Sequence, residues 1–500
     1  MPEANVKFQH LQGDPSGRVG CDFDRMLNED IFLRTTGATL IHGNRLRLLR
    51  DGRENYPAWV EAIGSARRTI HLETYIVHPD QTGRRFRDLL TQKAREGVRV
   101  RVLYDWFGSL HLGRGGMWKP LMEAGGEVRA MNPPSLNSLL GWASRDHRKL
   151  LTVDGRRAFI SGLCIGDAWV GNPAKGIQPW RDTGVEIEGP AVADAEAAFA
   201  STWKVAGGSI PESELIKREA ISPAGSVALR IVSTTPETAN LYRMDLMVAA
   251  AVQRTLWLTD AYFIGTTAYL QALRSAARDG VDVRLLVPHG SDIQWIANLS
   301  RTMYRSLLEA GVRVFEWNGP MIHAKTAVAD GRWARVGSTN LNIASWLGNW
   351  ELDVVIEDEA IGAQMAQMFI DDLKGATEVV LTGRNKVRPR RPIPRTPRLR
   401  AASGSGKSML SGVVRVGSTL NAAVRGNRPL NLAESSSLFS ISFIFGILAL
   451  LAIFFPKLIA YPIAGVAGWA GLWLLIKAMK LRFAQEARSP RSAVKRRDGR

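Results

Sequence analysis

Cysteine is scarce in this chain, with 2 residues in 500. These two, Cys21 and Cys164, are too few for the disulfide framework that stabilises small secreted domains. The first ten residues, MPEANVKFQH, also lack the apolar stretch that marks a secretory signal peptide. The sequence therefore predicts a protein that faces a reducing, cytosolic compartment.

Acidic residues are nearly absent from the C-terminal part. Residues 384–500 contain 22 Lys and Arg against 3 Asp and Glu, whereas the whole chain has a net charge of +18. Residues 1–383 consequently carry a net charge of about −1, so the basicity belongs to the tail. A near-neutral main region lacks the electrostatic footprint of a nucleic-acid-binding protein, and we expect no nucleic-acid partner.

Charged residues are missing from two apolar segments, Leu438–Phe455 and Leu458–Ile476, of 18 and 19 residues. Each approaches the ~20 residues that a helix needs to cross a bilayer, and only two residues separate them. We predict a transmembrane helical hairpin over residues 437–477; the alternatives are a buried helix pair in a soluble core and a shallow re-entrant pair. The basic flanks favour a cytoplasmic location for both ends of the hairpin and for the catalytic region.

The hairpin is preceded by a basic linker over residues 384–436 and followed by a basic cytoplasmic tail over residues 478–500. The linker begins with a Pro- and Arg-rich stretch, Arg384–Arg400, which is typical of an extended tether. Such a stretch is also attracted to anionic lipid by roughly 1 kcal/mol per charge near the surface. A membrane of anionic lipid is therefore an expected partner, and a merely solvated tether is the alternative.

One pattern occurs twice in the main region. His147–Gly155 reads HRKLLTVDG and His323–Gly331 reads HAKTAVADG, so both copies follow His-x-Lys-x-x-x-x-Asp-Gly. Two copies of one His/Lys/Asp constellation suggest a single active site at the seam between two similar halves. An imidazole can attack phosphorus, a lysine can neutralise phosphate oxygens, and a second imidazole can protonate the leaving alcohol. The pair therefore points to phosphoryl chemistry without a metal.

The repetition extends beyond the motif. Arg68–Leu72 aligns with Arg254–Leu258, and Glu123–Gly125 aligns with Glu309–Gly311. Each half also has the same order of strand, helix and strand. The predicted elements are Thr69–Val77, Arg85–Glu96 and Val98–Tyr104 in the first half, and Thr255–Ile264, Ala268–Asp279 and Val281–Val287 in the second. This order predicts an α/β fold with two pseudo-symmetric halves, over residues 39–215 and 216–383, after an N-terminal extension of residues 1–38.

Inside each motif, Leu150–Val153 and Thr326–Ala329 have the pattern of strands that turn at the Asp-Gly pair. Residues two apart on a strand share a face, so each histidine is expected beside its own lysine. Asn340 follows His323 by 17 residues and can donate to a phosphate oxygen. Glu351 follows by 28 and is a candidate for orienting a histidine.

This doubled motif, together with Gly337–Asn340 and Glu351, resembles the phospholipase D superfamily over roughly residues 40–385. The resemblance implies a covalent phosphohistidine intermediate, no cofactor and no metal, with His147 as nucleophile and the other histidine as acid and then base. It implies a catalytic set and a substrate-binding set. The catalytic set is His147, Lys149, Asp154, His323, Lys325 and Asp330, and the substrate-binding set is Ser338, Asn340, Glu186 and Glu351.

The first half departs from the family pattern at one position. Cys164 stands 17 residues after His147, where the family usually has Asn. The thiol either leaves the phosphate cradle asymmetric or simply packs in the core, and we favour packing. In this half the orienting carboxylate is expected to be Glu186, delayed by an insertion over Leu163–Pro179.

Further stretches resemble bacterial cardiolipin synthases: His71–Ile76, Tyr104–Asp105, Arg145–Lys149, Trp180–Gly184 and Asp260–Phe263. That resemblance implies condensation of two phosphatidylglycerols with release of glycerol, in a multi-pass protein of the bacterial inner membrane. A phospholipid hydrolase and a phosphatidyltransferase using another alcohol are the alternatives. A nuclease is disfavoured by the predicted anchor. An apolar loop at Asn132–Trp142 is expected either to dip into the bilayer or to be buried, and the sequence does not specify an oligomeric state.

Overall fold

The computed structural model of the chain describes residues 29–112, 116–133, 144–172, 174, 176–382, 387–389 and 468–469. All but residues 468–469 of the expected membrane hairpin, most of the basic linker, the basic tail, Cys21 and most of the apolar loop lie outside these residues. Among the described residues, no helix is both long and apolar enough to cross a membrane.

The described strands form one sheet of 16 strands in the order β16-β15-β11-β10-β9-β12-β13-β14-β8-β1-β7-β6-β5-β2-β3-β4. The first half supplies β1 (Ile41–Arg50), β2 (Thr69–Thr74), β3 (Arg99–Asp105), β4 (Glu127–Met131), β5 (Lys149–Val153), β6 (Arg157–Ser161) and β7 (Thr183–Glu188). The second half supplies β8 (Val227–Thr234), β9 (Thr255–Thr259), β10 (Asp282–Pro288), β11 (Arg313–Trp317), β12 (Thr326–Ala329), β13 (Trp333–Gly337), β14 (Glu351–Glu357), β15 (Ala376–Leu381) and β16 (Val387–Pro389).

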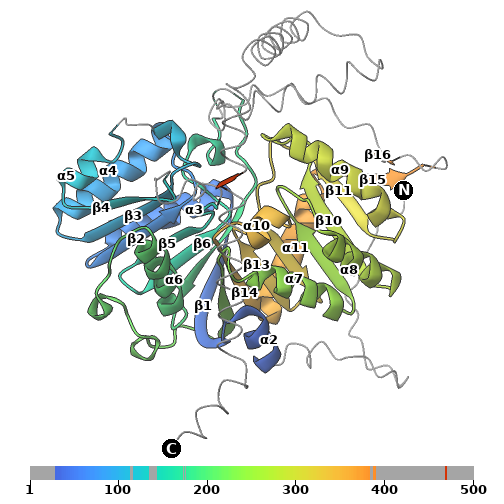
Figure 1. Ribbon diagram of the computed structural model, residues 1–500, viewed down its shortest axis with the longest axis horizontal. Coiled ribbons are helices and arrows are strands. Elements are labelled where there is room, and N and C mark those ends of the chain that lie inside the picture. The colour runs from blue at the N-terminus through green and yellow to red at the C-terminus, as the bar shows by residue number, and fades with distance from the viewer. Residues whose placement is uncertain are drawn as a thin grey trace, which may run out of the picture. The chain divides into compact units, whose positions relative to one another are not determined.

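The strand order repeats about the centre of the sheet. Reading outwards, the first half runs β1-β7-β6-β5-β2-β3-β4 and the second runs β8-β14-β13-β12-β9-β10-β11, so each strand of the first half has a counterpart, and β15 and β16 extend the second half beyond the repeat. Strands β1 and β8 pair antiparallel and join the halves, which lie side by side in Figure 1. The prediction of two pseudo-symmetric α/β halves is therefore confirmed.

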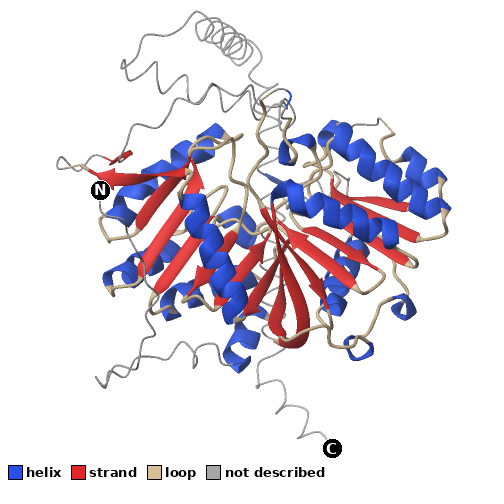
Figure 2. Ribbon diagram, turned by 180° about the vertical axis from the view of Figure 1, so that it is seen from behind, coloured by secondary structure: helices blue, strands red, loops and turns tan. Residues whose placement is uncertain are grey.

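Helices cover both faces of the strands (Figure 2). They are α2 (Glu29–Thr36), α3 (Asp51–Ser65), α4 (Gln81–Arg95), α5 (Lys119–Glu123), α6 (Val192–Val205), α7 (Asn240–Ala251), α8 (Thr267–Arg278), α9 (Gln294–Leu308), α10 (Ile343–Leu347) and α11 (Glu359–Leu373). The predicted strand–helix–strand units correspond to β2-α4-β3 and β9-α8-β10, with shifts at their ends. Helix α2 carries Phe32 into the core of the second half, although it precedes the first half in sequence.

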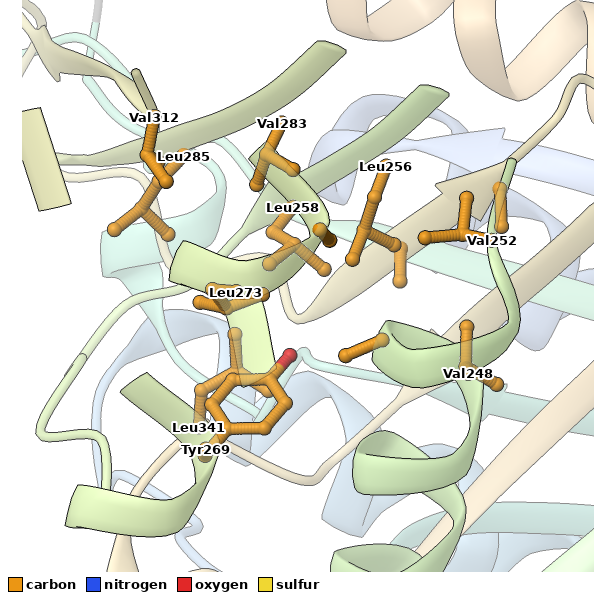
Figure 3. Packing of buried hydrophobic residues seen from close by; sticks show 14 of the residues in the cluster. Val248, Val252, Leu256, Leu258, Tyr269, Leu273, Val283, Leu285, Val312 and Leu341 are labelled. Atoms are coloured by element: carbon orange, nitrogen blue, oxygen red, sulfur yellow. The ribbon is translucent and has the colours of Figure 1, made fainter. Parts of the chain in front are cut away.

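The apolar core has three main parts. One lies under α3, α4 and α5 of the first half, where Phe86 and Leu90 are buried. A second lies under α7 and α8 of the second half, where Leu256, Leu258 and Tyr269 meet (Figure 3). The third joins the halves, because α6 and α11 bury their apolar faces with residues of both central sets of strands. Burial of this shared core holds the halves in a fixed relation, which a site at the seam requires.

The connectivity brings both histidine motifs to one edge of the sheet. Strand β5 pairs antiparallel with β2 so that Lys149 lies opposite Thr74, at the carboxyl end of β2. Strand β12 pairs with β9 in the same way, with Thr326 opposite Thr259. The first residues of each motif therefore lie where the parallel strands end, an edge at which α/β proteins commonly bind ligands.

Candidate active site

The first histidine pairs with a carboxylate of the other half. His147 Nδ1 lies 3.0 Å from one carboxylate oxygen of Glu351 and 3.1 Å from the other. Glu351 also accepts hydrogen bonds from Ser338 Oγ at 2.5 Å and from Asn349 Nδ2 at 3.2 Å. Glu351 was predicted to orient a histidine, and its partner proves to be the histidine of the opposite half.

The second histidine repeats this arrangement in reverse. His323 Nδ1 lies 2.9 Å from Asp182 Oδ2, and the Trp169 indole donates to the same oxygen at 2.9 Å. Asp182 belongs to the first half, immediately before β7. Each half thus supplies the carboxylate that orients the imidazole of the other half, so neither histidine–carboxylate pair exists in one half alone.

Backbone pairing across the seam sets this geometry. The His147 amide donates to the Trp350 carbonyl at 2.9 Å, next to Glu351. The His323 amide donates to the Arg181 carbonyl at 2.7 Å, next to Asp182. Each histidine is therefore held by a main-chain hydrogen bond beside the residue that orients its ring, and the site is rigidly supported.

The prediction that Glu186 orients a histidine is wrong. Glu186 accepts hydrogen bonds from Arg47 and Arg157, side chains of the neighbouring strands β1 and β6. It lies four residues along β7 from Asp182, and extended backbone advances about 3.3 Å per residue, so Glu186 is displaced from the edge where the histidines lie. A signal for Asp182 exists in the sequence. Aligning Ile187-Glu188 with Ile356-Glu357 places Asp182 on Glu351.

The motif aspartates are also far from the imidazoles, which corrects their predicted catalytic role. Asp154 accepts backbone N–H groups of Arg67, Arg68 and Thr69 at 2.7–2.9 Å, at the start of β2. Asp330 accepts those of Gln253, Arg254 and Thr255 at 2.8–3.1 Å, at the start of β9. Six residues of mostly extended chain lie between each aspartate and its histidine, which corresponds to roughly 20 Å at 3.3 Å per residue.

These aspartates instead close the hairpins that carry the motifs. Asp154 and Asp330 adopt φ values of 55° and 51°, and the glycine after each also has a positive φ. Successive left-handed residues suit a tight hairpin turn, for which Asp-Gly is a favoured pair. The predicted turns are confirmed, and they pin one end of β5 and β12 to the strands beside them.

The two lysines face the seam together. Lys149 donates to the carbonyl of His147, and Lys325 donates to the carbonyl of His323. Each imidazole feels the positive charge of both lysines. The two motifs therefore contribute to one electrostatic environment, as a shared site requires, and their summed charge favours an anion there.

Burial makes the resting histidines neutral. His147 and His323 are 7% and 5% exposed. Desolvation is the largest cause that lowers the pKa of His147 to about 4, opposed by Glu351 and assisted by the lysines. Desolvation and Lys325 lower the pKa of His323 to about 3, against the attraction of Asp182.

The carboxylates keep their charge despite burial. Desolvation opposes ionisation of Glu351, but its contact with His147, the charge of Lys149 and the hydrogen bond from Ser338 bring its pKa below the ordinary value. The pKa of Asp182 is lowered in the same way by His323. Because a carboxylate only accepts, a proton on Nδ1 of each imidazole completes these contacts and leaves the Nε2 lone pair available. Lys325 Nζ also lies 3.0 Å from His323 Nδ1.

Burial also weakens the charge of one lysine. Desolvation is the largest cause that lowers the pKa of Lys325 to about 8, with Asp182 acting against it and Lys149 acting with it. Lys325 is thus still mainly protonated at neutral pH.

Ser338 contacts Glu351, and Asn340 follows it by two residues. Ser338 donates to Glu351, while the nearest partner of Asn340 Nδ2 is Ser345 Oγ at 3.5 Å and Asn340 Oδ1 has no hydrogen-bond partner. In the first half, Cys164 packs in the apolar cluster under α3 and α4, in agreement with the packing interpretation. Burial raises the pKa of its thiol.

Aromatic rings enclose the two imidazoles unequally. Tyr75 contacts His147 edge-on at 5.0 Å between ring centroids. Trp169, Trp180 and Tyr262 all lie within 5.6–5.8 Å of the His323 ring. The tryptophans at 169 and 180 are therefore positioned around the second histidine. In the described part of the chain, no group of three or more potential metal-ligating His, Cys, Asp or Glu side chains occurs.

Comparison with known proteins gives the family. A family described as "Cardiolipin synthase, PLD-like domain" matches residues 59–203 and 247–373. The chain is 33% identical over 341 residues to the major cardiolipin synthase ClsA of Bacillus subtilis, covering 67% of this chain and 70% of that protein. It is 34% identical over 346 residues to cardiolipin synthase A of Pseudomonas fluorescens, covering 67% and 70%.

A solved structure shares the fold. Phosphatidylserine synthase of Haemophilus influenzae superposes with a TM-score of 0.54 at 15% sequence identity, covering 67% of this chain and 87% of that one. Each part of the family match contains one histidine motif and one carboxylate of a cross-half pair. The chain belongs to the cardiolipin synthase family of phospholipase D-like phosphatidyltransferases.

Proposed function

We propose that this enzyme condenses two phosphatidylglycerol molecules into cardiolipin and glycerol, with His147 as nucleophile and His323 as acid and base. The observation that carries this proposal is the pair of cross-half contacts, His147 to Glu351 and His323 to Asp182. They give two oriented, neutral imidazoles beside two lysines, which is the set that a two-step phosphoryl transfer needs.

In the first step, Nε2 of His147 attacks the phosphorus of one phosphatidylglycerol. The bond between phosphorus and the oxygen of the headgroup glycerol breaks, and His323 donates a proton to that oxygen. The phosphodiester charge helps Asp182 to favour the protonated form of His323 and thereby opposes the burial that lowers the pKa of this histidine. Lys149 and Lys325 neutralise the non-bridging oxygens.

In the second step, a terminal hydroxyl of the other phosphatidylglycerol attacks the phosphohistidine. His323 accepts the hydroxyl proton, the new oxygen–phosphorus bond forms, and the bond to His147 breaks. Glu351 stabilises the positive charge on His147 during the first step and keeps its proton on Nδ1. Asn340, which follows Ser338 by two residues and whose amide is weakly bonded, is the side chain we assign to a phosphate oxygen.

The membrane anchor belongs to this proposal. A phospholipid presents its phosphodiester at the bilayer surface, so an enzyme acting on it gains from attachment there. The uncharged segments Leu438–Phe455 and Leu458–Ile476 have the length and composition for a helical hairpin. The basic residues on both sides favour a cytoplasmic catalytic region in a bacterial inner membrane.

Expression in bacterial cells that lack cardiolipin tests the activity. We expect cardiolipin among the separated lipids when the wild-type chain is produced, and none with the His147→Ala variant at equal protein level. Release of phosphatidate without cardiolipin would contradict the condensation and favour the hydrolase. A different phosphatidyl ester would favour another alcohol acceptor.

A further inference from the structure

A buried arginine links the two halves behind the first histidine. Arg148 is 0% exposed and follows His147 in the chain. Its Nη1 donates to the Ala198 carbonyl at 3.0 Å and to Thr202 Oγ1 at 3.3 Å, both on α6 of the first half. Its Nη2 donates to Ser233 Oγ on β8 of the second half. The guanidinium therefore bridges the seam.

The same side chain contacts the residues that carry Glu351. The guanidinium carbon lies 5.4 Å from the centroid of the Trp350 ring, a cation–π distance. Arg148 also reaches the Thr234 carbonyl at 3.5 Å, and Thr234 is the β8 partner of Glu351 in the strand register. Arg148 thus follows His147 in the chain and packs against the neighbours of Glu351. It is therefore linked to both members of the His147–Glu351 pair.

Two buried carboxyl groups provide the counter-charge. Glu73 and Asp146 are both 0% exposed, and Arg148 attracts each of them. Asp146 Oδ2 has no hydrogen-bond donor, and Glu73 interacts with the Thr202 hydroxyl and with the Asp146 carboxyl group. Two carboxylates can bond to each other only when one of them is protonated. One proton on the pair would therefore supply the donor that Asp146 Oδ2 lacks.

Burial agrees with one proton on the pair. Desolvation raises the pKa of Glu73 and raises that of Asp146 well above its ordinary value, and the charge of Glu73 adds to the latter effect. Asp105, whose carboxylate accepts from the Asp146 amide at 2.8 Å, adds further negative charge nearby. One negative charge on the pair then balances the guanidinium.

The repeated positions of the second half carry no such group. Its counterparts of Glu73, Asp146 and Arg148, taken from the offsets of the repeated segments, are Thr259, Ile322 and Ala324. His323 is instead surrounded by aromatic rings. The Arg148 cluster therefore has no counterpart at the repeated positions, and His323 is supported differently, by buried Arg181, which lies next to Asp182 and pairs with Asp51 and Asp372.

We propose that Arg148 is a positioning residue for the His147–Glu351 pair, and that a single negative charge shared by Glu73 and Asp146 holds it in place. This inference rests on the proposed function, because it assumes that His147 attacks phosphorus. Arg148 acts through its neighbours and does not touch the substrate. A displaced guanidinium would let the Trp350 and Thr234 backbone shift, and Glu351 with it.

Charge counting gives a test that uses isosteric changes. Glu73→Gln and Asp146→Asn each leave one carboxylate and one amide that can donate to it, so each should keep kcat within about threefold of wild type. The double variant keeps side-chain size and hydrogen bonding but removes the negative charge. We expect its kcat to fall by at least about tenfold, with KM for phosphatidylglycerol nearly unchanged.

Arg148→Met is the second test, with Arg230→Met as its matched control. Arg230 is equally buried at 0% exposure but pairs with Glu29 and Glu357, away from the histidines. Near-isosteric loss of the Arg148 guanidinium should lower kcat about 100-fold, as expected for a misplaced reacting group. Arg230→Met should lower the melting temperature while the folded protein keeps its kcat.

The outcomes separate the two proposals. A wild-type chain without transferase activity would contradict the proposed function. With an active wild type, single variants as impaired as the double variant would overturn the shared charge, and so would a fully active double variant. If Arg148→Met fails to fold, the comparison of the single and double variants still tests whether Glu73 and Asp146 share one negative charge. A folded Arg148→Met with wild-type kcat would overturn the positioning role.

Discussion

The cross-half pairing of histidine and carboxylate predicts that the two carboxylates serve different chemical steps. Glu351→Gln removes the charge that faces His147 at 3.0 Å while keeping the size of the side chain. The amide then presents N–H to either Ser338 or Asn349, which both donate to the carboxylate in the wild-type protein. The variant therefore loses the counter-charge and misaligns one hydrogen bond.

The magnitude follows from the contact that is lost. A hydrogen bond to a charged group contributes about 1.5–3 kcal/mol. At 1.4 kcal/mol per factor of ten, attack by His147 should slow about tenfold to 100-fold. Asp182→Asn should have little effect on attack itself when the leaving group needs no proton, because Asp182 orients His323.

A phosphatidyl ester of p-nitrophenol isolates the attack, since this leaving group departs without an acid. In stopped flow, we expect Glu351→Gln to slow the burst of p-nitrophenolate by that factor. Asp182→Asn should keep a normal burst and slow the later transfer to phosphatidylglycerol, because His323 must take a proton from the acceptor. Equal effects of both variants on the burst would refute the division of roles, and the reverse pattern would make His323 the nucleophile.

Three other predictions follow from the same geometry. His147→Ala and His323→Ala should each abolish cardiolipin synthesis from phosphatidylglycerol, and full activity of either would contradict a shared site. Both buried histidines stay neutral in the folded protein down to about pH 4 and about pH 3, whereas unfolded histidine gains a proton below about pH 6.5. The free energy of unfolding should therefore fall as pH decreases from 6.5 to 4, by up to about 1.4 kcal/mol per pH unit for each histidine. In urea titrations, the variant with both histidines changed to Gln should lose the part of this pH dependence that the two histidines cause. Asp154→Ala removes the acceptor of three backbone N–H groups and should lower the free energy of unfolding by roughly 2–4 kcal/mol. The folded fraction should keep a kcat close to wild type. A large loss of kcat without loss of stability would contradict the structural role of Asp154.

The sequence is sufficient for the repeated architecture. Apolar periodicity and the repeated Arg-Thr and Glu-Ala-Gly segments predict strands and helices that the structure contains, because burial of one face dictates both patterns. The hairpin turns at the two Asp-Gly pairs are also local, since a pair of left-handed residues is decided by the turn alone. These elements needed no information from the other half.

The partners of the histidines were not predictable in the same way. Asp182 is separated from its motif by the insertion at Leu163–Pro179, so a fixed offset from His147 misses it. Its contact with His323 depends on how the two halves pair across the seam, where the His323 amide donates to the carbonyl of Arg181, the residue before Asp182. Long-range register of this kind is a property of the assembled sheet, and the same holds for the Arg148 contacts with β8.

The stoichiometry of the covalent intermediate tests the shared site most directly. The purified Asp182→Asn enzyme, mixed with a p-nitrophenyl phosphatidyl donor and quenched, would be weighed by intact-protein mass spectrometry and its modified peptide mapped. The account predicts one phosphatidyl group per chain, on His147, and none when His147→Ala is added. Two phosphatidyl groups on one chain, on His147 and His323 together, would show two independent sites and contradict it.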